Sequence, residues 1–330
     1  MRIVAFILAI VIATALLMGG ALLLITRTDD AHQVWVFVAT FAMIMFVYGP
    51  LTLGSFRAYW NVAGSASSRR YFRRTVCVVV GLEILAAVVI VVYALSTAAS
   101  ALIPVLFIGS GVVLTALALL IGPALYRYDE ARRPASSDWV AIEPALIRRR
   151  IVAVAITFLG VLALSVIAFT ILDGVAPHSL TIGQDFAFAV EFACFVSAFV
   201  AIFSTVGWNR RMRDITDRDP SRLRRVARVV LRNKKEDLDE QDLEAAARYA
   251  AFIPITMTFQ IAYFILLYAG IVLEQVDQLR DGDSDHLAVP LIALFVAILV
   301  ILVPLQITRI RRARRYAREH PVGLTAPSAQ

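Results

Sequence analysis

Eight apolar stretches of about 20 residues each constrain the fold of this chain more than any other feature of its sequence. A helix of about 20 apolar residues crosses a hydrocarbon core about 30 Å thick. Lipid offers no hydrogen-bonding partners, so each crossing segment must satisfy its backbone groups within a helix. The predicted spans are residues 3–25, 34–56, 75–95, 102–125, 151–172, 186–207, 251–273 and 287–307.

Composition supports a membrane protein and excludes two other classes. Of the 330 residues, 60% are hydrophobic and only 17% are charged, whereas a soluble domain carries about 25% charged residues. A soluble domain of this length could not bury so much apolar surface, and a disordered chain would be far more polar. The predicted fold class is therefore an all-α polytopic membrane protein with eight transmembrane helices.

Arginine gathers in alternate loops between the predicted spans. The loops after the second and fourth spans and the tail 308–330 are strongly basic, whereas the opposite loops hold only Arg27 and Arg280. The positive-inside rule then places both termini in the cytoplasm of a bacterial-type plasma membrane. The net charge of +7 is explained by this topology, and it does not indicate a nucleic-acid partner.

Short sequence matches between the two halves predict an internal duplication. They indicate two parallel four-helix repeats, 1–149 with a cytoplasmic linker and 150–330, related by an axis along the membrane normal. The alternative is chance matching within an apolar sequence of low complexity. The matches are residues 2–5 with 150–153, Trp60-Asn61 with Trp208-Asn209, Arg70-Tyr71 with Arg248-Tyr249, and Pro123 with Pro304.

The second half contains a predicted cytoplasmic insertion, residues 210–247, between its second and third spans. Asp219 and Pro220 predict the start of a helix that is apolar on one face and basic elsewhere. Such a helix is typical of segments that lie on anionic lipid; alternatively, residues 219–245 dock a partner membrane protein. The acidic run 236–244 either pairs with this helix or extends the seventh span. The predicted docking side chains are Arg222, Arg224, Arg225, Arg228 and Arg232.

Glu83 and Glu191 are the only charged residues inside the predicted spans. A carboxyl group is costly in hydrocarbon and usually faces the interior of a helix bundle. The functional interpretation is a site that handles protons or cations. The alternative is a neutral glutamic acid hydrogen-bonded across a helix interface or, for Glu191, a side chain that reaches the outer head groups. The repeat aligns Glu83 with Gln260 when a shift of one residue is allowed, and it places Thr40 about one turn from Met43, the position that matches Glu191.

The sixth predicted span has two distinct faces, about 120° apart by helical geometry. Because small residues let helices pack closely, the stripe that holds Glu191 is predicted to face a neighbouring helix. The phenylalanine stripe is predicted to face lipid or a wider gap. The first stripe is Ala187, Glu191, Cys194, Ala198, Ala201 and Thr205, and the second is Phe188, Phe192, Phe195, Phe199 and Phe203.

Motifs for cofactors, metals and catalysis are not found in the sequence. Cys77 and Cys194 are far apart, and no histidine lies in a predicted span, which argues against a dithiol site and a membrane haem. Residues 281–286 begin like a calcium loop but lack its glycine and final glutamate. With no HExxH, Walker A or GxSxG motif either, no cofactor, metal ligand or catalytic residue is predicted.

Two functions fit these features. The first is a permease-like transporter or channel for a small solute or ion, in which Glu83, Glu191 and Gln260 line or gate a path between the halves. The alternative is a non-catalytic membrane subunit or scaffold that binds another membrane protein or lipid. A membrane enzyme acting on lipid is the least favoured. A cavity that reaches either glutamate would favour transport, and a dry, closed bundle would favour the scaffold.

Overall fold

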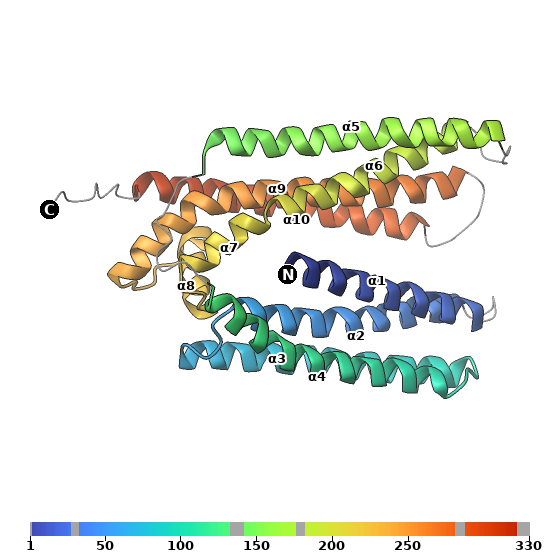
Figure 1. The fold of residues 1–330 in the computed structure, drawn as a ribbon, viewed down its shortest axis with the longest axis horizontal. Helices are drawn as coiled ribbons and strands as arrows, with labels where there is room; N and C mark the ends of the chain where they lie inside the picture. The colour runs from blue at the N-terminus through green and yellow to red at the C-terminus, as the bar shows by residue number, and fades with distance from the viewer. Residues whose placement is uncertain (1, 28–32, 133–141, 176–181, 281–287, 322–330) are drawn as a thin grey trace. The chain divides into compact units, whose positions relative to one another are not determined.

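The computed structural model describes residues 2–27, 33–132, 142–175, 182–280 and 288–321. All regular structure in these ranges is helical (Figure 1). The helices are α1 Arg2–Arg27, α2 Gln33–Tyr59, α3 Ala66–Ser96, α4 Leu102–Glu130, α5 Pro144–Val175, α6 Ile182–Ser204, α7 Val206–Asp214, α8 Pro220–Arg232, α9 Glu240–Arg280 and α10 Ala288–Glu319.

Seven helical segments within the described ranges are long and apolar enough to cross a membrane. They are α2, α3, α4, α5, the consecutive pair α6 and α7, α9 and α10. These segments indicate a multi-pass, all-helical membrane protein. For α1, side chains are described only from Ile12 onward, and the apolar stretch Ile12–Thr26 is by itself too short to span. The eighth span therefore stays a prediction, as does the orientation of the chain.

Contacts divide the chain into two compact units. The first unit is residues 1–137 together with 217–221, and the second is residues 138–216 together with 222–330. In the first unit α2 packs on α1, α3 and α4, whereas in the second α6 packs on α5 and α9, and α10 packs on α9. Helices α2 and α4 of the first unit are thus in extensive contact, whereas no equally extensive contact joins α6 to α10, their predicted counterparts, in the described residues. The predicted duplication stays a prediction.

Small residues bring α2 and α4 of the first unit close together. Gly54 and Ala58 on α2 lie one turn apart, as do Ala118 and Gly122 on α4. A Cβ atom at Gly122 would lie 2.7 Å from the Cβ of Arg57 and 3.1 Å from the carbonyl oxygen of Gly54. Because neither backbone has room for a larger side chain, this contact uses the small-residue packing typical of membrane helices.

Proline in α4 creates a second link between these two helices. Pro123 has no N–H group, so the carbonyl of Leu119, four residues earlier, loses its helical donor. The Nη1 atom of Arg57 donates a hydrogen bond of 3.0 Å to this carbonyl oxygen. The basic end of α2 is thereby hydrogen-bonded to the turn of α4 that precedes Pro123.

Gly122→Ala is expected to destabilise the first unit by about 1–3 kcal/mol, the usual cost of overpacking. The matched control is Gly109→Ala on the same helix, where no atom lies within 4 Å of the added Cβ. Thermal unfolding in detergent, followed by size exclusion, compares the two variants. Equal unfolding temperatures would contradict the close approach of α2 and α4.

In the second unit, the start of α9 and the end of α10 extend beyond the predicted spans, and α8 packs on them. The apolar face of α8 is buried there, with Val226 and Val230 packed against Tyr249 and Ile253 of α9 and against Ala313 of α10. Trp208 of α7 is also buried; its ring meets that of Phe259 edge-on. The extension is therefore a small protein core in its own right.

Candidate functional site

Glu83 of α3 is fixed in an interface between three helices of the first unit. The Oγ1 atom of Thr115 on α4 donates a hydrogen bond of 2.7 Å to Glu83 Oε1. On α2, Gly49 lies so close that a Cβ there would be 3.3 Å from the same carboxyl oxygen. This geometry favours the structural interpretation of Glu83. Thr115 was missed because its position in an apolar run does not reveal which helix lies beside it.

Glu191 of α6 has a different environment. It lines a groove between α5 and α6, with a volume of about 370 Å³. Its carboxylate makes no hydrogen bond or ion pair with any residue that the structure describes. Of the two acids in the predicted spans, Glu191 is therefore the one whose side chain lies on an open groove.

The faces of α6 only partly match the prediction. Cys194, Ala198, Ala201 and Thr205 are buried, as expected for a helix-facing stripe. Glu191, however, shares its groove with phenylalanines from the second stripe. The reason is that residues 188, 191, 192 and 195 follow helical spacing, so Glu191 lies at the border between the two faces.

Gln260 and Thr40 are both half-buried. Thr40 lies in α2 of the first unit with Glu83, and Gln260 lies in α9 of the second unit with Glu191. Their predicted roles beside a transport path stay predictions.

A second cavity, of about 390 Å³, lies in the first unit among α1, α2 and α4. Its lining is almost entirely apolar; Ser55 and Tyr59 supply hydroxyl groups, and no charged side chain is among the described lining residues. This cavity offers little chemistry beyond contact with hydrocarbon.

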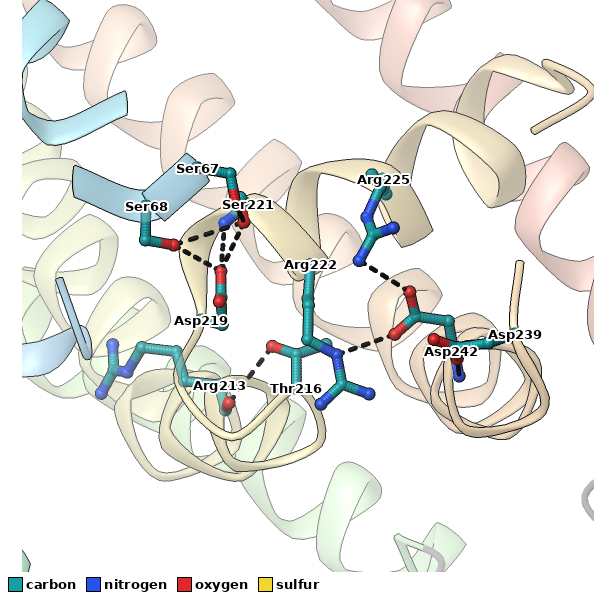
Figure 2. A network of polar contacts seen from close by, with 10 residues as sticks. All are labelled: Ser67, Ser68, Arg213, Thr216, Asp219, Ser221, Arg222, Arg225, Asp239 and Asp242. Carbon is teal, nitrogen blue, oxygen red and sulfur yellow. Dashed lines mark hydrogen bonds and ion pairs between the residues drawn. The ribbon is translucent and has the colours of Figure 1, made fainter. Parts of the chain in front are cut away.

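The predicted helix start at Asp219 is confirmed, since α8 begins at Pro220 and Asp219 Oδ1 accepts a hydrogen bond of 2.8 Å from the N–H of Ser221. The acidic run both pairs with α8 and begins α9. Asp242 is fully buried and forms ion pairs with Arg222 (2.8 Å) and Arg225 (3.1 Å) (Figure 2).

The other predicted docking side chains differ in their surroundings. Arg228 pairs with Glu236 at 2.9 Å, whereas Arg224 and Arg232 are exposed. Arg222, Arg225 and Arg228 are thus balanced by acids of the same unit. Docking of lipid or of a partner protein through this segment stays a proposal.

Residues 217–221 form a polar cluster in the first unit that the sequence did not predict. The carbonyl oxygen of Arg218 accepts a hydrogen bond of 2.8 Å from the N–H of Asn61. Asp219 Oδ1 also accepts a hydrogen bond of 2.5 Å from Ser68, beside Ser221 (Figure 2). The guanidinium of Arg218 is buried against Asp129 of α4, with Nη1 2.9 Å from Oδ2.

The backbone of this cluster is unusual. Asp217 and Arg218 have φ angles of 50° and 57°, the left-handed region that non-glycine residues adopt at a cost of about 1–3 kcal/mol each. The surrounding contacts compensate for that cost. Aspartate tolerates this region but arginine rarely adopts it, so the sequence does not predict two such positions in succession.

No group of three or more His, Cys, Asp or Glu side chains that could hold a metal ion occurs within the described ranges. The acidic loop 281–286, which includes His286, lies outside these ranges, as do His32 and His178. No protein-family model matches this sequence, and comparisons with curated proteins and with solved structures find no match either.

Proposed function

We propose that this chain is a permease-like transporter or channel for a small solute or ion, with Glu191 as its central side chain. The observation that carries the proposal is the carboxylate of Glu191 on the wall of a groove between α5 and α6, without a protein partner in the described residues. An intramembrane carboxylate is costly, and such groups often mark ion or substrate paths.

Glu83 has a supporting role in this proposal. Its carboxyl group is bonded to Thr115 and packed beside Gly49, so it holds α2, α3 and α4 together. Transport therefore depends on Glu191 and not on Glu83, which gives the proposal an internal control.

The expected result is that Glu191→Gln lowers solute-evoked currents in proteoliposomes at least tenfold, because the amide keeps the shape of the side chain and loses its charge. Currents are recorded on solid-supported membranes after jumps in Na⁺, K⁺, ammonium or small organic cations. Glu83→Gln is the matched control and should retain more than half of the wild-type current. Wild-type currents no larger than those of protein-free liposomes across the whole panel would refute transport.

A second candidate, the non-catalytic subunit or scaffold, is favoured by the basic surface of the second unit. α10 continues to Glu319, well past the predicted span end at 307, and its arginines beyond the span are mostly exposed. Clusters of this kind attract anionic lipid or an acidic protein surface. If the chain is a scaffold, Glu191→Gln should leave its binding to lipid or to a partner protein unchanged. The exposed arginines are Arg311, Arg312, Arg314, Arg315 and Arg318.

A further inference from the structure

The groove beside Glu191 is lined by two helix faces that meet across the α5–α6 contact. Each face follows helical spacing, three residues from α5 and four from α6. Its polar groups are the carboxylate of Glu191 and the hydroxyl of Ser165, and no basic side chain is among the described lining residues. The lining consists of Ser165, Ala168, Phe169, Phe188, Glu191, Phe192 and Phe195.

Aromatic rings form most of this surface, and the ring of Phe195 also contacts α9. Gly270 of α9 packs against Phe195, since a Cβ at that glycine would lie 3.3 Å from the ring. Phe192 and Phe188 are 58% and 41% exposed, so their rings are available to a ligand. The groove is thus a largely preformed aromatic surface around one carboxylate.

The electrostatic environment of the groove is negative. Glu274 and Asp277 of α9 act electrostatically on Glu191, and both belong to the same unit. The face of a phenylalanine ring also carries partial negative charge. An anionic ligand would be repelled from this position, whereas a cation would be attracted by the carboxylate and by the rings.

The size and chemistry of the groove select among cations. A metal ion such as Ca²⁺ needs six to eight oxygen ligands, and the groove offers one carboxylate and one hydroxyl. A volume of about 370 Å³ lies within the range of about 300–1,000 Å³ for small-molecule pockets. Aromatic rings around a counter-ion are the usual recognition device for quaternary ammonium groups.

We infer that this groove binds a lipophilic organic cation, of the quaternary ammonium or phosphonium class, with Glu191 as its counter-ion and the phenylalanine rings around its apolar substituents. The inference rests on the proposed function, because it names the substrate class of the same site. The carboxylate contributes charge and the rings contribute both apolar contact and cation–π attraction. The ligand reaches the groove from the bilayer, where an apolar cation is enriched.

The test uses the full-length chain in nanodiscs of phosphatidylethanolamine and phosphatidylglycerol, which contain no choline head group. Binding of radiolabelled tetraphenylphosphonium is measured at equilibrium. We expect one saturable site per chain, an at least tenfold weaker affinity in Glu191→Gln, and an affinity within twofold of wild type in Glu83→Gln. Phe192→Leu should weaken binding about three- to tenfold, whereas Phe199→Leu, on the same helix but outside the groove, should have no effect.

Tetraphenylborate separates charge recognition from simple hydrophobic binding, because it has nearly the same shape and the opposite charge. It should not displace the phosphonium. Displacement by the borate, or wild-type affinity in a Glu191→Gln variant with wild-type elution and thermal stability, would overturn the inference. Saturable binding without any cation-evoked current would refute transport and leave the site standing. Currents that depend on Glu191 without tetraphenylphosphonium binding would leave transport standing and overturn the ligand class.

Discussion

Asp129→Asn is expected to lower the unfolding free energy of the first unit by about 3–5 kcal/mol, more than any other single substitution proposed for this chain. The side chains of Asp129 and Arg218 are only 7% and 3% exposed, and their charged atoms are 2.9 Å apart. Removing the Asp129 charge deprives the buried guanidinium of Arg218 of its counter-ion at 2.9 Å. Loss of such a buried partner is far more costly than loss of a surface pair.

The neighbouring acid provides the matched control. Glu130 also contacts Arg218, at 3.4 Å, but its side chain is 44% exposed. Glu130→Gln should therefore cost at most about 1 kcal/mol. Thermal unfolding in detergent compares the variants, and trypsin cleavage after Arg218 reports release of residues 217–221. If both variants unfold alike, the burial of Asp129 is not what holds this cluster.

Asp242→Asn should have the second largest effect. It should lower the free energy that holds α8 against α9 by about 2–3 kcal/mol, the usual contribution of a hydrogen bond to a charged group. Asp242 is fully buried, but Arg222 and Arg225 are 20% and 44% exposed. These arginines regain water when the carboxylate is lost, so the cost is smaller than for Asp129. Hydrogen exchange should increase throughout residues 222–232.

Glu236→Gln is the control for this second prediction. Glu236 pairs with Arg228 on the same helix, yet both side chains are partly exposed, at 21% and 38%. Its removal should change stability by less than about 1 kcal/mol. An unchanged exchange rate in Asp242→Asn would indicate that apolar packing of Val226 and Val230 alone holds α8.

The sequence predicted the apolar helices and the start of α8 because both depend on short-range information. Seven of the predicted spans coincide with helices long enough to cross a membrane, since hydrocarbon leaves the backbone no alternative to a helix. The start at Pro220 follows from the conformational preference of proline and from the cap at Asp219. Neither inference requires knowledge of which helices are neighbours.

The sequence could not predict that Glu83 and Glu191 have different surroundings. Both are single acids in apolar runs, and the sequence allows a functional and a structural interpretation of each, with contact to the outer head groups as a further alternative for Glu191. Only the packing of α4 against α3 provides Thr115 to Glu83, while the α5–α6 contact leaves Glu191 on an open groove. Packing between distant segments also decides the surroundings of α8. The sequence predicts that its apolar side faces lipid, but α9 and α10 cover Val226 and Val230.

By itself, the sequence determined that this chain is helical, apolar and suited to a membrane, because these properties depend on composition and on periodicity along one segment. Tertiary structure decided which charges are balanced and which acid lies on an open groove. Asp129 and Arg218 are 89 positions apart, and no local pattern marks them as partners. Burial and counter-ion choice are set by contacts between distant segments, so they became visible only once the helices were packed.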